Sequence, residues 1–300
     1  MQHKSGFITI IGRPNAGKST FINNVLGQKI AIMSDKAQTT RNNIQGIYTD
    51  EDSQMVFIDT PGIHKPHHEL GRRLVDMAYQ AMQGVDIILF MVDAKEGLGG
   101  GDLRIIENLK NYKIPVLLVL NKIDLLKGKM AIDRVILDYM KLYPFEGIFP
   151  ISAKEKTHID HLLEEIKRLL PEGPCFYPDD MITDHPERFL VSELIREKVL
   201  NLTREEIPHS IAVVIDSMKD DPEEENLVNI YATIVCERPS QKGIIIGAQG
   251  QLLKKIRLLS KKEIAKLLGK NVNLELWVRV KKDWRNRQVD LKNFGYDEEY

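Results

Sequence analysis

The stretch GRPNAGKS at residues 12–19 constrains the fold of this chain more than any other feature of its sequence. It follows the apolar run FITIIG at 7–12 and opens a helical pattern over 18–26, the setting that a P-loop requires. Its glycines let backbone N–H groups surround phosphate oxygens, and the helix N-terminus adds a favourable dipole. The motif predicts a nucleotide-phosphate site, but it does not distinguish ATP from GTP, or hydrolysis from transfer to an acceptor.

Around this motif, apolar strand-like runs alternate with helical patterns. This alternation predicts an α/β domain with a mostly parallel sheet and helices on both faces. The strand-like runs are 7–12, 44–49, 54–59, 85–94, 115–122 and 147–152, and the helical stretches are 18–26, 66–83, 101–111, 130–141 and 158–170.

The alternation stops at PEGPCFYPDD, which contains three prolines and no helical or strand period. We therefore expect a domain at 1–172, a linker at 173–185 and a second domain at 186–300. The second domain has an α-β-β-α-α-β order, which indicates an α+β fold. Its elements are expected at 186–203, 210–218, 227–237, the short helix around QKGIII, 251–269 and 271–281.

Composition sets outer limits on location and chemistry. The formal net charge of −1 gives the whole chain no nucleic-acid signature, and the two cysteines form no metal or redox motif. The start of the chain has no apolar signal-peptide region, and runs such as IILFMV are too short to span a membrane. A cytoplasmic location is expected, with peripheral membrane contact left open.

The stretch NKID at 121–124 indicates which base is bound. Guanine presents two adjacent donors, and the carboxylate of Asp124 can accept both, whereas adenine offers no such pair. A site built for this pairing rejects the wrong base because its carboxylate would lose its partners. Asn121 is expected to bridge the base and the P-loop, the stem of Lys122 to lie along the base, and SAK at 152–154 to close the pocket.

Two loops between these motifs are expected to sense the γ-phosphate. In DTPG, Asp59 is predicted to hold Mg²⁺ and Gly62 to offer its N–H to the γ-phosphate. In QTTR, Thr39 or Thr40 would complete the metal site beside Ser19, and Thr40 is favoured. The predicted nucleotide-binding residues are Gly12, Arg13, Pro14, Asn15, Ala16, Gly17, Lys18, Ser19, Thr20, Asp59, Thr60, Pro61, Gly62, Asn121, Lys122, Asp124, Ser152, Ala153 and Lys154.

The residue after Gly62 is Ile63, where the best-known switch GTPases have a glutamine that orients the attacking water. An aliphatic side chain cannot orient water by hydrogen bonds, so slow intrinsic hydrolysis is expected. The predicted catalytic residues are Lys18, Thr40, Gly62 and Asn15.

The C-terminal region is basic although the whole chain is nearly neutral. From Arg238 to Lys292 there are fifteen basic residues against four acidic ones. Within this region, GIIIGAQGQLLKKI places a Gly-x-x-Gly turn between two helices and resembles a KH domain, whose turn clamps single-stranded RNA. Ala248 and Gln249 depart from the basic residues common in such turns. The predicted RNA-binding residues are Lys242, Gly243, Ile244, Ile246, Gly247, Ala248, Gln249, Gly250, Lys254, Lys255 and Arg257.

Taken together, GRPNAGKST, QTTR, DTPGIHKP, NKID, SAK, SQKGIIIGAQG and LELWVRVKKDWR resemble the bacterial Era GTPases over essentially the whole chain. The resemblance implies a GTP-hydrolysing factor of ribosome biogenesis that binds the 3′ end of small-subunit rRNA and the pre-30S particle. It also implies that Ile63 is normal, that some members associate with the inner membrane, and that Asn15 helps to hold K⁺ near the phosphates, as in a subgroup of GTPases. A monomer is the default expectation.

Two other interpretations remain open at this stage. A signalling switch could use the basic C-terminal region to bind a protein or a membrane surface, which would leave the Gly-x-x-Gly turn without a function. A P-loop kinase would share the GRPNAGKS motif, but NKID and SAK argue against it, and no acceptor site is evident.

Overall fold

The structure is a computed structural model that describes residues 3–36, 38–66, 68–205 and 207–296. Its contacts divide the chain into two compact units. The first comprises residues 1–31, 40–67 and 71–184, and the second comprises residues 32–39, 68–70 and 185–300. Among the helices of the described residues, none is long and apolar enough to cross a membrane.

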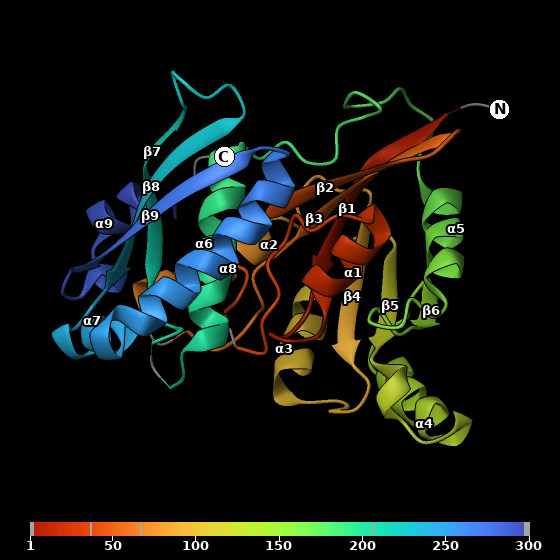
Figure 1. Cartoon of the computed structure of the whole chain (residues 1–300). Helices are drawn as coiled ribbons and strands as arrows, with labels where there is room; N and C mark the ends of the chain where they lie inside the picture. The colour runs from red at the N-terminus through yellow and green to blue at the C-terminus, as the bar shows by residue number, and fades with distance from the viewer. Residues whose placement is uncertain (1–2, 37, 67, 206, 297–300) are drawn as a thin grey trace. The chain divides into compact units, whose positions relative to one another are not determined.

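The first unit is built on a six-stranded sheet with the order β2-β3-β1-β4-β5-β6 (Figure 1). Only β2 runs antiparallel to its neighbour, so the predicted mostly parallel sheet is confirmed. The strands are β1 (Lys4–Ile11), β2 (Ile44–Thr49), β3 (Ser53–Asp59), β4 (Ile87–Asp93), β5 (Val116–Asn121) and β6 (Gly147–Pro150).

Helices cover both faces of this sheet because almost every side chain of the central strands is apolar and buried. On one face, residues of α2, α3 and α4 form a common core with β4 and β5. On the other, α1 packs through Phe21, whose ring lies 5.8 Å from that of Phe57. The helices are α1 (Lys18–Leu26), α2 (Glu69–Gln80), α3 (Gly100–Leu109), α4 (Lys129–Met140) and α5 (Ile159–Leu169).

Two expectations for this region need adjustment. The helix predicted for 66–83 is observed only as Glu69–Gln80, and residue 67 lies outside the described residues. Most of the expected linker packs on the first unit, where the Phe176 ring lies 4.8 Å from that of Phe7. Gln54 Oε1 accepts the N–H groups of Phe176 (2.7 Å) and Tyr177 (3.0 Å), so a buried amide of β3 fixes this segment.

The second unit has a three-stranded sheet, β7-β8-β9, in which β7 and β8 are antiparallel and β8 and β9 are parallel. The predicted α-β-β-α-α-β order is confirmed, with α6 and α8 side by side against the sheet (Figure 1). The elements are α6 (Glu187–Leu202), β7 (Ala212–Asp220), β8 (Leu227–Cys236), α7 (Pro239–Ile246), α8 (Gln251–Leu268) and β9 (Asn271–Val280).

A short helix, α9 (Gln288–Asn293), follows this sheet and was not expected from the sequence. It is held by Trp284, which is completely buried and donates from Nε1 to the carbonyl of Ser210 at 2.9 Å. The Trp284 ring also contacts those of Phe294 and Tyr296. Six residues are too few for a recognisable helical period, so this helix could not be predicted from periodicity.

Candidate nucleotide and RNA sites

The P-loop connects the end of β1 to the start of α1, at the edge where the parallel strands end. Lys18 is buried, and its Nζ donates to the carbonyls of Gly12 (3.4 Å) and Arg13 (3.3 Å). Burial lowers the pKa of Lys18, while the negative charge of Asp59 acts in the opposite direction. The P-loop backbone therefore surrounds the ammonium group of Lys18, which the sequence analysis predicts to contact the phosphates.

Three oxygen-bearing side chains from separate segments converge beside this lysine. Ser19 Oγ donates to Asp59 Oδ2 at 2.6 Å, and Thr40 Oγ1 lies 3.0 Å from Ser19 Oγ and 3.4 Å from Asp59 Oδ2. Asp59 is completely buried, and its Oδ1 has no hydrogen-bond partner among the described residues. Burial raises the pKa of Asp59, against the effects of Lys18, Ser19 and Thr40. An unsatisfied buried carboxylate oxygen with two hydroxyl groups fits a hard cation such as Mg²⁺.

The DTPG segment lies directly against the P-loop. A Cβ added at Gly62 would lie 2.6 Å from the backbone nitrogen of Pro14, so only glycine allows this approach. The buried hydroxyl of Thr60 is directed instead to the carbonyl of Ile10, at 2.7 Å. Ile63 is 4% exposed and belongs to the core formed with α2 and α3. Ile63 is therefore a packing residue of the first unit.

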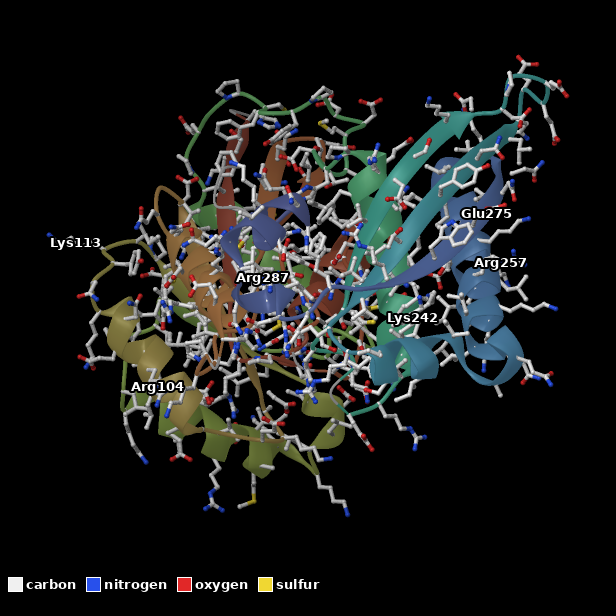
Figure 2. The ribbon with its side chains drawn as sticks, turned by 90° about the vertical axis from the view of Figure 1, so that its left-hand side faces the viewer. Arg104, Lys113, Lys242, Arg257, Glu275 and Arg287 are labelled. Atoms are coloured by element: carbon white, nitrogen blue, oxygen red, sulfur yellow. The ribbon has the colours of Figure 1, made fainter. Side chains whose placement is uncertain are left out.

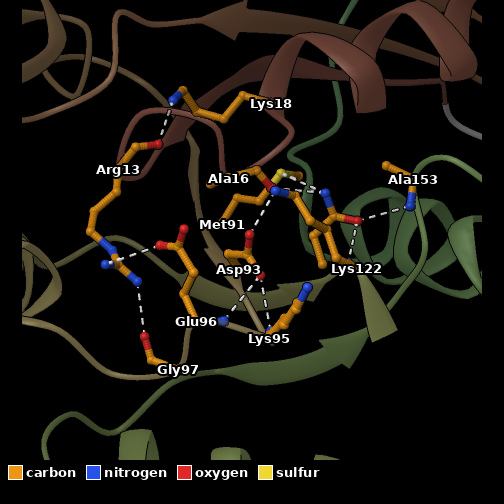
Figure 3. A network of polar contacts seen from close by, with 11 residues as sticks. Arg13, Ala16, Lys18, Met91, Asp93, Lys95, Glu96, Gly97, Lys122 and Ala153 are labelled. Carbon is orange, nitrogen blue, oxygen red and sulfur yellow. Dashed lines mark hydrogen bonds and ion pairs between the residues drawn. The ribbon is translucent and has the colours of Figure 1, made fainter. Parts of the chain in front are cut away.

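Asn121 is the hub of the base-binding end, and it is almost completely buried. Its Nδ2 donates to the carbonyl of Ala16 (2.8 Å), and its Oδ1 accepts the N–H groups of Ala153 (2.9 Å) and Lys122 (2.8 Å). One amide thus joins the P-loop, the NKID segment and the SAK segment. Its partners Ala16, Lys122 and Ala153 are labelled in Figure 3. The bridge to the P-loop is present, and the same amide also fixes Ala153 of SAK.

Asp124 is exposed, and the hydroxyl of Ser152 donates to its Oδ1 at 2.6 Å. The Ser152 hydroxyl in turn accepts the N–H of Glu155 at 3.2 Å. This arrangement orients an accessible carboxylate, which is what recognition of two adjacent guanine donors requires. Ser152 therefore orients the Asp124 carboxylate.

Asp93 is a residue of this site that the sequence analysis did not identify. It ends β4, and its Oδ2 accepts the ammonium group of Lys122 at 2.6 Å. Its Oδ1 accepts the N–H groups of Lys95 (2.9 Å) and Glu96 (3.3 Å), which fixes the start of the β4–α3 loop (Figure 3). A lone aspartate after a buried strand matches no sequence motif. Its position at the carboxyl end of a parallel strand could have indicated a ligand site, because ligands bind at that edge of such sheets.

The remaining predicted residues lie around these groups. Asn15 is exposed in the P-loop with a φ of 63°, and Thr20 lies one residue beyond Ser19 in α1. Lys154 is exposed and pairs with Glu155 at 3.2 Å. Thr39 donates from Oγ1 to the carbonyl of Lys36 at 2.6 Å. Of the two threonines, Thr40 is therefore the one whose hydroxyl joins Ser19 and Asp59.

In the second unit, the Gly-x-x-Gly turn joins α7 to α8. Gly247 and Gly250 have φ angles of 74° and 77°, the left-handed region that favours glycine. A Cβ at Gly247 would lie 2.8 Å from Cβ of Leu252, whereas a Cβ at Gly250 would meet nothing within 4 Å. The turn is thus close-packed at its first glycine and open at its second, which precedes the N-terminus of α8.

The predicted RNA-binding side chains surround this turn. Lys242, Ile244, Gln249, Lys254, Lys255 and Arg257 are exposed, and Ile246 is half-buried. Figure 2 labels Lys242 and Arg257, which come from α7 and α8. Ile244, in the last turn of α7 and three residues before Gly247, leaves 53% of its surface exposed. Exposed cations can contact the phosphates of a single-stranded nucleic acid, and Ile244 adds an apolar surface beside them.

Comparison with known proteins gives the family. A family described as 50S ribosome-binding GTPases matches residues 7–122, and the KH domain family matches residues 206–285. A crystal structure of Era with MgGDPNP and nucleotides 1506–1542 of 16S ribosomal RNA has 42% identity and a TM-score of 0.96; the match covers 98% of this chain and 99% of that one. The chain belongs to the Era family of GTPases.

A second Era structure agrees with this assignment. It is a single-residue variant of Aquifex aeolicus Era bound to GDP·AlF₄⁻, with 43% identity, a TM-score of 0.95 and coverage of 98% of this chain and 99% of that one. The resemblance noted in the sequence is confirmed, and with it the GTPase activity and the KH domain. Membership of the Era family favours the first of the three interpretations over a signalling switch or a P-loop kinase.

Proposed function

We propose that this GTPase binds the 3′ end region of small-subunit rRNA through its second unit and acts in assembly of the small ribosomal subunit. The observation that supports this most directly is the glycine turn at Gly247–Gly250, which is open at Gly250 and lies between Ile244 and the basic start of α8. The Era structure that carries nucleotides 1506–1542 of 16S ribosomal RNA matches almost all of this chain. The partners of the protein described here would be GTP or GDP, this RNA and the pre-30S particle.

Magnesium would be held in the first unit by Ser19, Thr40 and Asp59. The unsatisfied Oδ1 of Asp59 and the short distances among the three side chains support this, as does the MgGDPNP in the Era structure. When bound, the ion neutralises charge on the phosphate oxygens. The hydroxyls of Ser19 and Thr40, now satisfied by Asp59, would turn to the ion.

Hydrolysis converts GTP and water to GDP and phosphate without covalent participation of the protein, so positioning and electrostatics carry the catalysis. Lys18 would place its ammonium group on the β- and γ-phosphates, leaving the carbonyls of Gly12 and Arg13. Gly62 would offer its N–H to the γ-phosphate from beside Pro14. Since Ile63 is in the core, no side chain at that position orients the water, and we propose a slow intrinsic rate.

A potassium ion held with the help of Asn15 would supply charge beside the β- and γ-phosphates. Asn15 is exposed at the turn of the P-loop with a left-handed backbone, so its oxygen can reach an ion outside the protein surface. The test is the hydrolysis rate in KCl and in NaCl for the unmodified protein and for Asn15→Ala. Equal rates of the unmodified protein in both salts would contradict this role.

The experiment for the RNA function is crosslinking in cells followed by sequencing of the bound RNA, with Gly250→Asp as the test variant. Gly250 and Gly269 flank α8, both have left-handed backbones and both face open space, so Gly269→Asp is a matched control. We expect reads at the 3′ end of small-subunit rRNA that are lost with Gly250→Asp and kept with Gly269→Asp. Scattered reads that neither variant alters would contradict the proposal.

Location and assembly state complete the proposal. We infer a cytoplasmic monomer that contacts the inner face of the membrane peripherally. The basic residues of α8 would favour an anionic lipid surface as well as RNA. Sedimentation of the purified protein with and without anionic vesicles tests both points, because it reports the mass of the free protein and the bound fraction together.

A further inference from the structure

The side chain of Arg13 is anchored on the side of the P-loop that faces α3. Its Nε donates to Asp102 Oδ1 at 3.1 Å, and its NH2 donates to the carbonyl of Gly97 at 2.9 Å. A longer ion pair joins its NH1 to Glu96 at 3.4 Å (Figure 3). Arg13 is thus held by three groups of the β4–α3 segment, on Glu96, Gly97 and Asp102, which lie 83 to 89 residues away in the sequence.

Asp102 is the central group of this anchor. Its side chain is completely buried, and besides Arg13 it accepts the N–H of Gly99 at 2.9 Å. Burial raises the pKa of Asp102, while the N–H of Gly99 and the charge of Arg13 act in the opposite direction. A buried carboxylate requires a partner of this kind, since an unpaired charge is costly. The pair is therefore a fixed point rather than an exposed ion pair.

The glycines at the start of α3 make room for the arginine. A Cβ at Gly99 would lie 2.9 Å from NH1 of Arg13, and a Cβ at Gly101 would lie 2.8 Å from its Cδ. By contrast, a Cβ at Gly100 would meet nothing within 4 Å. The first turn of α3 is thus shaped to the path of this side chain.

The same residue also shapes the phosphate end of the site through its backbone. The carbonyl of Arg13 accepts Lys18 Nζ at 3.3 Å and the N–H of Ala16 at 3.4 Å. Because the side chain and the carbonyl belong to one residue, fixing the guanidinium restricts where the carbonyl points. The contact of Arg13 with Asp102 therefore restricts, through the Arg13 carbonyl, the position of the Lys18 ammonium group and of the turn that carries the phosphate-binding N–H groups.

The β4–α3 segment supports the base end as well, through the ion pair of Asp93 with Lys122 at 2.6 Å. Asp93 and Asp102 lie at the two ends of one segment and hold opposite ends of the nucleotide site. Asp93 therefore offers a direct control, because its loss should weaken binding of the base, whereas loss of Asp102 should weaken binding of the phosphates.

We propose that Arg13, anchored by Asp102, is a positioning residue for the phosphate-binding loop rather than a ligand of the phosphates. This deepens the nucleotide site described above and rests on it. The guanidinium does not reach the γ-phosphate as a catalytic arginine would; it holds the P-loop in the shape that receives the β-phosphate.

The test measures dissociation constants for GMP and GDP, by competition against a fluorescent GDP. The dissociation constant for GMP divided by that for GDP reports what the β-phosphate contributes to binding. We expect Arg13→Gln and Asp102→Asn each to lower this ratio about tenfold while the GMP affinity is unchanged. The double variant should lose no more than either single one, because both remove the same interaction.

Two controls separate positioning from general damage. Asp93→Asn should weaken GMP and GDP equally and leave the ratio unchanged, since it acts on the base end. Arg104→Gln removes an exposed arginine from the same helix (labelled in Figure 2) and should change neither constant. Thermal denaturation of each variant monitors folding.

Arg13→Lys keeps the charge but cannot reach Asp102 and Gly97 together, so an intermediate ratio is expected. If Asp102→Asn fails to fold, the two Arg13 variants carry the test, because Arg13 is partly exposed. An unchanged ratio in folded Arg13→Gln, or additive losses in the double variant, would overturn the inference. Absence of GDP binding by the unmodified protein would instead contradict the nucleotide site itself.

Discussion

The backbone N–H of Ile63 donates to the carbonyl of Gly12 at 3.0 Å, and its side chain is buried in the core of the first unit. The position that holds a water-orienting glutamine in the best-known switch GTPases is thus occupied here by a packing residue that ties DTPG to the P-loop.

Introducing glutamine at this position should therefore not accelerate hydrolysis. Ile63→Gln would place an amide in an apolar core and cost about 1–3 kcal/mol of stability. Ile63→Val is the control, with an expected cost of about 0.5–1.5 kcal/mol. Urea denaturation and single-turnover GTP hydrolysis measure the two effects. A faster rate with Ile63→Gln at unchanged stability would show that the side chain can face the nucleotide.

Gly62→Ala should affect GTP more than GDP. The added methyl group would lie 2.6 Å from the nitrogen of Pro14 and push DTPG away from the P-loop. Displacement of a packed backbone costs about 1–3 kcal/mol, so a loss of about tenfold or more in GTP affinity is expected. Gly100→Ala, with open space around its added methyl group, is the control. Equal losses for GTP and GDP would argue against a contact specific to the γ-phosphate.

Asp59→Asn should stabilise the nucleotide-free protein while it impairs magnesium-dependent nucleotide binding. The buried carboxylate has an oxygen without a partner, and neutralising it should contribute on the order of 1 kcal/mol. Urea denaturation without nucleotide, and GTP binding with and without Mg²⁺, test the two halves. A destabilised variant would mean that the attraction between the charges of Asp59 and Lys18 outweighs the cost of burial.

Two variants of the base end should separate selectivity from orientation. Asp124→Asn should weaken GTP by about 1.5–3 kcal/mol and improve binding of the xanthine nucleotide, because the amide reverses one donor–acceptor pair. Ser152→Ala should cost only about 1 kcal/mol and keep the preference for guanine, since it removes the hydroxyl that orients Asp124. Competition binding with GTP and XTP measures both. An unchanged preference in Asp124→Asn would mean that another group selects the base.

The lysines at the start of α8 should act through phosphates. Lys254→Ala and Lys255→Ala are each expected to lower the slope of log affinity for RNA against log salt by about 0.7, the value of one phosphate contact on a single strand. Lys270→Ala is the control, because its ammonium pairs with Asp220 at 2.8 Å. The measurement is RNA binding over a series of salt concentrations. If all three variants keep the slope of the unmodified protein, the RNA binds elsewhere.

Much of this protein could be predicted from the sequence because its signals are local. The P-loop, NKID and the Gly-x-x-Gly turn depend on spacing within a few residues, and the periodicity of 2 or 3.6 located most strands and helices. The short helix α9 escaped because its position depends on the buried Trp284 rather than on a pattern of its own.

By itself, the sequence determined the fold class, the family and the residue types that a guanine nucleotide and RNA require. The tertiary structure decided which way those side chains face. Ile63 is buried because its backbone is hydrogen-bonded to Gly12 of the P-loop and its side chain packs in the core with α2 and α3. Arg13 is anchored because the sheet brings Asp102 beside the P-loop. Neither relationship has a local signature, because both join segments separated by many residues, and only close packing around one sheet makes them neighbours.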